Sequence, residues 1–404
     1  MRHATRLPSY AVFAGFLAAA GLPLYIHAPK FYVDQFGVSL AALGAVLFAL
    51  RLLDVVQDPA LGWLARRLQA HRRLSVAAGG AVLVAGMLGL FLVPPPVPPL
   101  WWFAGMLTLV FSAFSYLTIC FYAEGVRGAM EGTGYLALAR WRETGALLGI
   151  CAASVAPLAL GGYSAFAIAF AVLGVVAIIA MRREWRAGGI ASEGIANVVK
   201  DHMARRLLII ALVNAAPVAV SSTLFLFYVD SVLQAQSWEG PLLLLFFLCA
   251  AISSPGWSRA AERYGPKPVL ILAMCLAIAA FSGAIFLGPG DVGPFAVICV
   301  FSGIAVGADL TLLPAMFARR MESVSPGASE AFGLWSFVSK FTLAIAAVTL
   351  LPALEAGGFD PGAENTGAAL ALLALAYGAL PCVLKLVAIA LLAVTRFGDE
   401  TEGT

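Results

Sequence analysis

The chain alternates long apolar blocks with short polar stretches over almost its whole length. Each block approaches or reaches the ~20 mostly apolar residues that a helix needs to cross the hydrocarbon core of a bilayer. The blocks predict twelve transmembrane helices near residues 10–33, 40–64, 75–94, 100–123, 138–160, 163–181, 206–229, 240–257, 268–287, 294–317, 331–353 and 368–394. We therefore expect an all-α integral membrane protein.

The composition supports this interpretation and excludes a soluble fold. Of the 404 residues, 61% are hydrophobic and 12% are charged, whereas soluble domains carry about 25% charged residues. A chain this poor in charge lacks the polar surface that a water-soluble protein of its size needs. The six cysteines all lie inside apolar blocks and form no C-x-x-C pair, so we expect neither disulfides nor a metal site from them.

The distribution of basic residues predicts the orientation of the chain. Most of the 25 Lys and Arg residues lie near the termini and in alternate loops, such as 65–74 and 182–206. The opposite loops, such as 93–99 and 288–293, contain none. Loops rich in Lys and Arg stay in the cytoplasm, so we expect a multi-pass protein of the cell inner membrane with both termini cytoplasmic. The net charge of +3 then reflects topology and indicates no nucleic-acid partner.

The two halves of the chain resemble each other at a fixed offset. Residues 31–34 (Phe-Tyr-Val-Asp) recur at 227–230, which is 196 positions later. At the same offset Pro59 matches Pro255, and Arg67 matches Arg263. A parallel repeat of this kind predicts the major facilitator fold, with two pseudo-symmetric six-helix bundles and alternating access. The predicted parts are an N-terminal bundle (1–181), a cytoplasmic linker (182–205) and a C-terminal bundle (206–404).

The second predicted helix carries charges in the middle of an apolar block. Asp54 and Asp58 are four residues apart and share a helix face, which Arg51 also reaches. Two neighbouring carboxylates in a low dielectric need either a cation or a proton between them, which favours a coupling-ion site for Na⁺ or H⁺. Gln57 adjoins the pair and offers another oxygen. The structural alternative is an Arg51–Asp54 ion pair, with Asp58 capping the cytoplasmic end.

Several segments in order along the chain carry a family resemblance. They are 31–39, 51–62 (Arg-x-x-Asp-x-x-x-Asp-Pro-x-x-Gly), 139–143 (Ala-Arg-Trp-Arg-Glu), 307–316 and 334–340 (Leu-Trp-Ser-Phe-Val-Ser-Lys). Together they resemble the glycoside–pentoside–hexuronide:cation symporter family, whose best-known member is melibiose permease. The resemblance implies that Asp54 and Asp58 bind the cation, with Gln57 as a further polar ligand. It also implies a hydroxyl ligand from the fourth helix, for which Ser115 and Thr118 are the candidates.

The resemblance also implies roles for residues of later helices. Arg142 matches an arginine near the sugar pocket, and Lys340 matches a lysine near the cation site, with Trp335 in the same segment as a substrate-binding candidate. The chain departs from the sugar-transporting members, because residues 15–21 contain no acid and the matching position of the fourth helix is Thr118 or Leu117. The resemblance therefore supports cation coupling better than it supports a sugar substrate.

Other charged residues inside apolar blocks are assigned separately. His27 lies late in the first block, where it either binds an anionic substrate or faces the membrane interface. Asp309 is expected to pair with Lys340 across neighbouring helices, in a charge network that also includes Arg51. Lys385 is expected to face the helix bundle, because a lipid-facing lysine in mid-span would be unstable.

These patterns predict a cation-coupled symporter of a small solute, such as a sugar or glycoside. The alternative is a carrier of an anionic or amphiphilic solute such as a lysolipid. A membrane sensor or enzyme is the least favoured class, because the chain contains neither H-E-x-x-H nor histidines spaced as metal ligands. We expect no cofactor beyond the coupling ion, and we expect a monomer.

Overall fold

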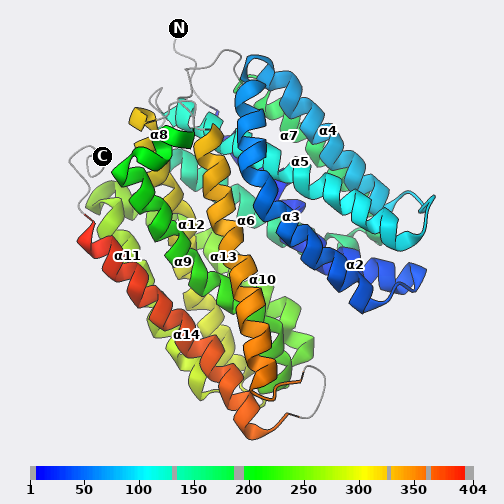
Figure 1. Cartoon of the computed structure of the whole chain (residues 1–404), viewed down its shortest axis with the longest axis vertical. Helices are drawn as coiled ribbons and strands as arrows, with labels where there is room; N and C mark the ends of the chain where they lie inside the picture. Colours follow the sequence, from blue (N-terminus) through cyan, green and yellow to red (C-terminus); the bar gives the residue numbers. More distant parts are fainter. Residues whose placement is uncertain (1–5, 130–133, 186–194, 325–328, 361–364, 396–404) are drawn as a thin grey trace. The chain divides into compact units, whose positions relative to one another are not determined.

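The computed structural model of the chain describes residues 6–129, 134–185, 195–324, 329–360 and 365–395. These residues form helices joined by turns, with no strand among them (Figure 1). The α-helices are α1 (Leu7–Ala19), α2 (Leu22–Phe36), α3 (Leu40–Arg67), α4 (Arg72–Phe91), α5 (Pro99–Gly128), α6 (Tyr135–Ala159), α7 (Tyr163–Met181), α8 (Ile195–Lys200), α9 (His202–Phe227), α10 (Glu239–Tyr264), α11 (Pro266–Ser282), α12 (Val292–Val324), α13 (Ser329–Ala356) and α14 (Gly367–Val394). Short helical turns are η1 (Gln69–His71), η3 (Tyr228–Val232), η4 (Gln236–Trp238) and η5 (Gly283–Phe286).

The first predicted span differs from the others, because it forms two helices. The chain breaks between α1 and α2 at Ala20 and Gly21, and α2 then begins with Pro23 in its first turn. Proline lacks the N–H that would continue the preceding helix, so this position favours a new helix start. Each later predicted span corresponds to one long helix, and four of these helices are extended directly by a short helical turn.

Among the described residues, 8 helices are long and apolar enough to cross a membrane. Neither α3 nor α6 is among them, and both carry several charged residues. The charged helices are therefore the ones that depend most on packing inside the protein, because a lipid-facing charge in mid-span is costly.

The residues divide into two compact units. Unit 1 comprises 1–201 and 318–337, and unit 2 comprises 202–317 and 338–404. The end of α12 and the first part of α13 thus belong to unit 1, although most of both helices belongs to unit 2. The predicted linker 182–205 contains α8, and its residues 186–194 lie outside the described residues.

Glycines allow a close helix contact in unit 1, between α1 and α6. A Cβ atom at Gly145 would collide with the backbone of Ala11, and one at Gly149 would collide with the backbone of Gly15. Small residues let two helix backbones approach closely, which favours van der Waals packing in a membrane. In the same unit, α4 and α5 run side by side (Figure 1).

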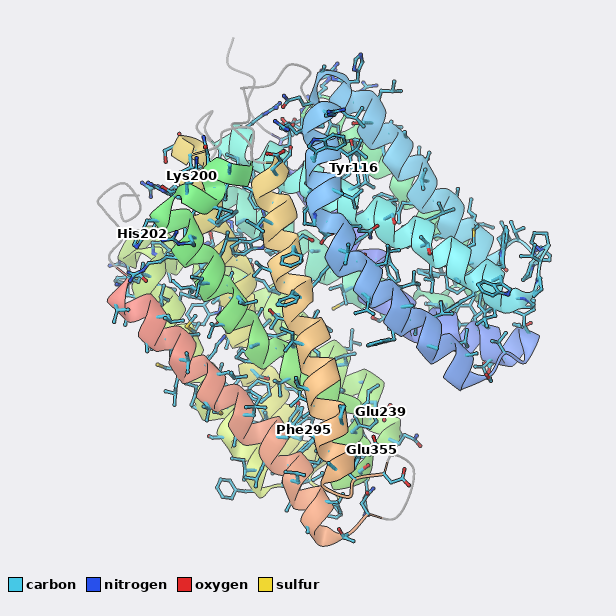
Figure 2. All side chains as sticks on the ribbon, in the orientation of Figure 1. Tyr116, Lys200, His202, Glu239, Phe295 and Glu355 are labelled. Carbon is cyan, nitrogen blue, oxygen red and sulfur yellow. The ribbon has the colours of Figure 1, made fainter. Side chains whose placement is uncertain are left out.

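Unit 2 has a core built around α9, α12 and α14. Tyr228 is fully buried and packs on Phe295, as Tyr32 packs on Phe103 in unit 1, with ring centroids 5.3 and 4.9 Å apart respectively. These tyrosines are the equivalent members of the sequence repeat. Figure 2 shows Glu239 and Glu355 towards one end of unit 2 and His202 at the other.

Candidate cation and solute sites

The polar face of α3 places the predicted cation ligands in a buried position. Ser39 precedes the helix and accepts the backbone N–H of Ala42 at 3.2 Å, which fixes the start of α3. Asp54 and Asp58 are 4% and 0% exposed. The amide nitrogen of Gln57 donates to Oδ1 of Asp54 at 2.8 Å, so these two candidate ligands are in direct contact.

Hydroxyl groups on α5 face the same region of unit 1. The hydroxyl of Ser112 donates to Oε1 of Gln57 at 2.8 Å. Ser115 is fully buried one helical turn later. The hydroxyl of Thr118 is buried, and within the described part of the chain it has no hydrogen-bond partner. Ser112 was missed in the sequence, although its spacing of three residues from Ser115 places both on one face of α5.

Asp58 reaches a partner far away in the sequence. The hydroxyl of Ser336 on α13 donates to Oδ2 of Asp58 at 2.6 Å. Both residues belong to unit 1. Sequence reasoning missed Ser336, although it follows Trp335 inside one of the family-like segments.

Arg142 lies in a buried cluster of unit 1. Its Nε donates to Oε1 of the neighbouring Glu143 at 2.7 Å, and its guanidinium lies 3.8 Å from the centroid of the Tyr122 ring. The Tyr122 hydroxyl donates to the same Glu143 oxygen. Nη2 of Arg142 is buried without a hydrogen-bond partner among the described residues, so one donor of this arginine is available to a ligand.

His27 and Trp335, the other substrate candidates, lie on α2 and α13. A ring nitrogen of His27 lies 3.1 Å from the carbonyl oxygen of Ser154 on α6. Trp335 is half-buried on α13. The side chain of Arg51 lies outside the described residues, so its predicted place in the charge network stays a prediction.

The predicted pair of Asp309 and Lys340 is wrong, because Asp309 pairs with Lys385. The Lys385 ammonium contacts Oδ2 of Asp309 and donates to Oδ1 of Asn214 at 2.7 Å. Asp309 and Lys385 are 7% and 3% exposed, as expected for a lysine that faces the bundle. The sequence suggested a partner on α13, the next helix along the chain. In the structure, Lys385 of α14 contacts both Asn214 of α9 and Asp309 of α12. Lys340 lies on α13 in unit 2.

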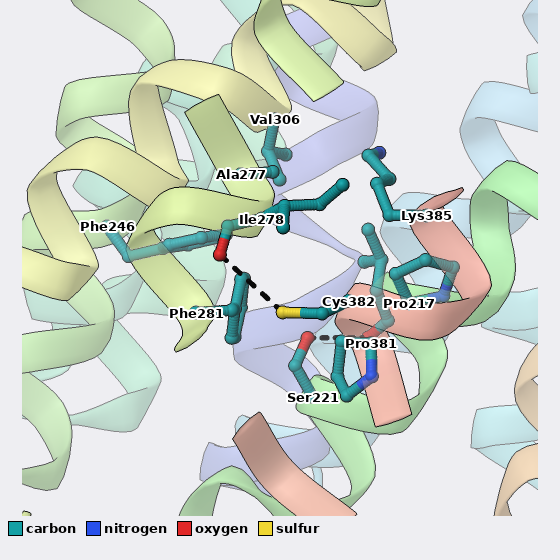
Figure 3. Close-up of a pocket in the computed structure, with 11 residues that line it drawn as sticks. Pro217, Ser221, Phe246, Ala277, Ile278, Phe281, Val306, Pro381, Cys382 and Lys385 are labelled. Carbon is teal, nitrogen blue, oxygen red and sulfur yellow. Dashed lines mark hydrogen bonds between the residues drawn. The ribbon is translucent and has the colours of Figure 1, made fainter. Parts of the chain in front are cut away.

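A small cavity of unit 2 borders Lys385 (Figure 3). Its walls are mainly apolar and include Phe246, Ile278, Phe281 and Val306. In Figure 3 the Lys385 side chain points away from Ser221. The cavity therefore combines apolar walls with one cationic residue.

Comparisons with known proteins agree with this architecture. Residues 9–399 match the model of a family described as MFS/sugar transport protein. No curated protein matches the chain.

Among solved structures, a variant of the fucose:proton symporter of E. coli superposes with a TM-score of 0.68 at 12% identity, covering 96% of this chain and 99% of that one. A bacterial homologue of the iron transporter ferroportin, in an outward-facing state with soaked iron, gives a TM-score of 0.67 at 14% identity, with 95% and 99% covered. At these identities the likeness shows the fold, which is that of major facilitator transporters.

Proposed function

Since the chain belongs to the MFS/sugar transport protein family, and is thus a multi-pass membrane transporter rather than an enzyme, we propose that it is a symporter that couples Na⁺ or H⁺ to the movement of a small solute. The solute class that we propose is a sugar or glycoside. We further propose the cell inner membrane as its location, with cytoplasmic termini and a monomeric working unit.

The observation that carries this proposal is the buried oxygen cluster on α3. Asp54, Gln57 and Asp58 occupy successive positions of one polar face, and Ser112 extends it from α5. Carboxylate, amide and hydroxyl oxygens are the ligands that hard cations prefer. Two buried acids on one helix face carry a high desolvation cost, which a bound cation would offset.

The proposed site also fits alternating access. In the major facilitator fold, two bundles expose a solute site to each side of the membrane in turn. A bound cation that neutralises Asp54 and Asp58 would lower the cost of enclosing them during that change, because an unpaired buried charge is strongly unfavourable. Cation binding and solute transport are then coupled, because the closed, solute-bound state is more stable when a cation neutralises Asp54 and Asp58.

A second candidate is an anionic or amphiphilic solute such as a lysolipid. The observation that favours it is the buried Nη2 of Arg142, which has no hydrogen-bond partner among the described residues. The chain also lacks the acids that sugar-transporting relatives place on their first and fourth helices. Competition assays in proteoliposomes, with neutral glycosides and a lysophospholipid as alternative competitors, would separate the two classes.

Cation binding to the purified protein tests the proposal directly. The fluorescence of the eight tryptophans is followed as Na⁺ replaces choline at several pH values. We expect a saturable response to Na⁺ or to protons that disappears in Asp54→Asn and Asp58→Asn. Asp291→Asn is the matched control, because this acid lies in a loop and accepts the N–H of Gly288. Responses in the α3 variants that equal wild type would overturn the symporter assignment.

A further inference from the structure

One face of α13 packs against the helices of unit 1 along residues 329–337, which we call the docking segment. Oε1 of Glu330 lies 2.8 Å from Nε of Arg66 at the end of α3. The Ser329 hydroxyl accepts a hydrogen bond from the guanidinium of Arg72 at 2.8 Å. Glu330, Ser329 and Arg72 are all nearly fully buried, whereas the Arg66 side chain is 34% exposed, so the interface is largely but not wholly closed to solvent.

Towards the middle of α3, the docking segment makes backbone contact. A Cβ at Gly333 would lie 3.0 Å from the carbonyl oxygen of Asp58 and 3.1 Å from Cα of Gly62, which is tighter than ordinary packing. One turn further, Ser336 donates to the Asp58 carboxylate. The contacts on α3 therefore recur every four residues, at 58, 62 and 66, and they bring one face of each helix together.

Asp58 thus belongs to two groupings at once. It is a member of the candidate cation cluster, and it is the end of the docking interface. The Ser336 hydroxyl directs its hydrogen at Oδ2, where it would stabilise the ionised form of this fully buried carboxyl group. A Na⁺ ion bound to this carboxylate would neutralise much of its charge, so the hydrogen bond from Ser336 is weaker in the Na⁺-bound state than in the Na⁺-free state.

We propose that Ser336 competes with Na⁺ for Asp58, so that Na⁺ binding loosens the docking segment from α3. This inference rests on the proposed function and adds to it a link between the cation site and α13. Thermodynamic linkage makes the effect reciprocal, so release of the segment raises Na⁺ affinity by the same factor. Because α13 continues into unit 2 from Val338, Na⁺ would act on a helix that both units share.

The first test removes the competing hydroxyl. Ser336→Ala should bind Na⁺ more tightly than wild type, by about three- to tenfold, since the variant loses a hydrogen bond that stabilises the Na⁺-free state more than the Na⁺-bound state. Thr349→Ala is the matched control, because this hydroxyl on the same helix bonds to the backbone of its own helix. Weaker Na⁺ binding in Ser336→Ala would make Ser336 a Na⁺ ligand and overturn the competition.

The second test needs no substitution. The Arg72 guanidinium donates both to Ser329 and to Sγ of the buried Cys120, so loss of the Ser329 contact leaves Arg72 freer to move away from this thiol. Alkylation of Cys120 in the wild-type protein, read by mass spectrometry, should become faster when Na⁺ replaces choline. Cys299, which is equally buried in unit 2, should react at an unchanged rate.

Failure of this inference and failure of the proposed function give different results. Saturable Na⁺ binding with equal affinities in wild type and Ser336→Ala, and with Cys120 alkylation insensitive to Na⁺, overturns the inference and leaves the proposed function intact. An absence of Na⁺ binding, with a proton response that is lost in Asp58→Asn, also overturns the inference alone. An absence of any response that depends on Asp54 or Asp58 overturns both.

Discussion

The buried pair of Asp309 and Lys385 makes each residue depend on the other. Removal of one partner leaves an uncompensated charge in a membrane span, which costs about 3–5 kcal/mol, whereas removal of both charges is often nearly neutral. We therefore expect Asp309→Asn and Lys385→Met each to lower the thermal stability of the detergent-solubilised protein, and the double variant to recover most of the loss. Thermal unfolding followed by tryptophan fluorescence measures all three.

The matched control for this double-variant cycle is Asp201→Asn. Asp201 pairs with Arg320 through two hydrogen bonds of 3.1 and 2.7 Å in a partly exposed position, where solvent screening weakens an ion pair and lowers the cost of an unpaired charge. Its loss should therefore lower the unfolding temperature less than the loss of Asp309. If the effects of Asp309→Asn and Lys385→Met simply add in the double variant, the two residues are not coupled as the structure indicates.

Ser112 should contribute to cation affinity through Gln57. Without its hydroxyl, Oε1 of Gln57 loses its donor and its orientation towards the site becomes less fixed. A neutral hydrogen bond contributes about 0.5–1.5 kcal/mol, so Ser112→Ala should weaken cation binding by about two- to tenfold. Thr108→Ala is the control on the same helix, because that hydroxyl bonds to the carbonyl of Ala104. Equal losses in both variants would speak for a general effect on α5.

The residues of the candidate site illustrate what spacing along one helix predicts and what it does not. The shared face of Asp54 and Asp58 followed from their separation of four residues. The bond from Ser336 to Asp58 joins residues 278 positions apart, and the Lys385–Asp309 pair joins residues 76 apart. Such contacts depend on which helices pack together, so no periodicity along the chain specifies them.

At the scale of helices, hydrophobic block length predicted nearly every element. The exceptions are α8, which lies in the predicted linker, and the first block, where a mostly apolar stretch conceals the break at Gly21. The length of an apolar block shows only that a segment is hydrophobic. Gly21 and Pro23 hardly change that hydrophobicity, so the block gives no sign of the break. Backbone propensity, which favours a new helix at Pro23, is the signal that would have located the break.

The α1–α6 contact should be the least tolerant helix interface of unit 1. Gly145→Ala places a methyl group against the backbone of Ala11, which cannot turn aside as a side chain can. Overpacking of this kind costs about 1–3 kcal/mol. We expect a lower unfolding temperature for Gly145→Ala. Gly105→Ala on α5 is the control, since a Cβ there meets nothing within 4 Å and alanine is the better helix former. Similar stabilities for both variants would contradict the close approach.

At the scale of the whole molecule, the proposed orientation predicts which loops face the cytoplasm. The helices α5, α6 and α7 lie between the loop at Val97 and the short helix α8, which ends at Lys200. If each of these three helices crosses the membrane, Val97 and Lys200 lie on opposite sides. Both side chains are exposed, so cysteines placed there are open to reagents from whichever side they face.

The test is labelling with a membrane-impermeant maleimide, with wild type as the background for the native cysteines. Val97→Cys should react on intact cells, whereas Lys200→Cys should react only after permeabilisation, because the loops near Lys200 carry the Arg and Lys residues that remain cytoplasmic. The reverse pattern would invert the orientation while preserving the span count. Labelling of both positions on intact cells would show that an even number of crossings separates them, and one of α5, α6 and α7 would then not span the membrane.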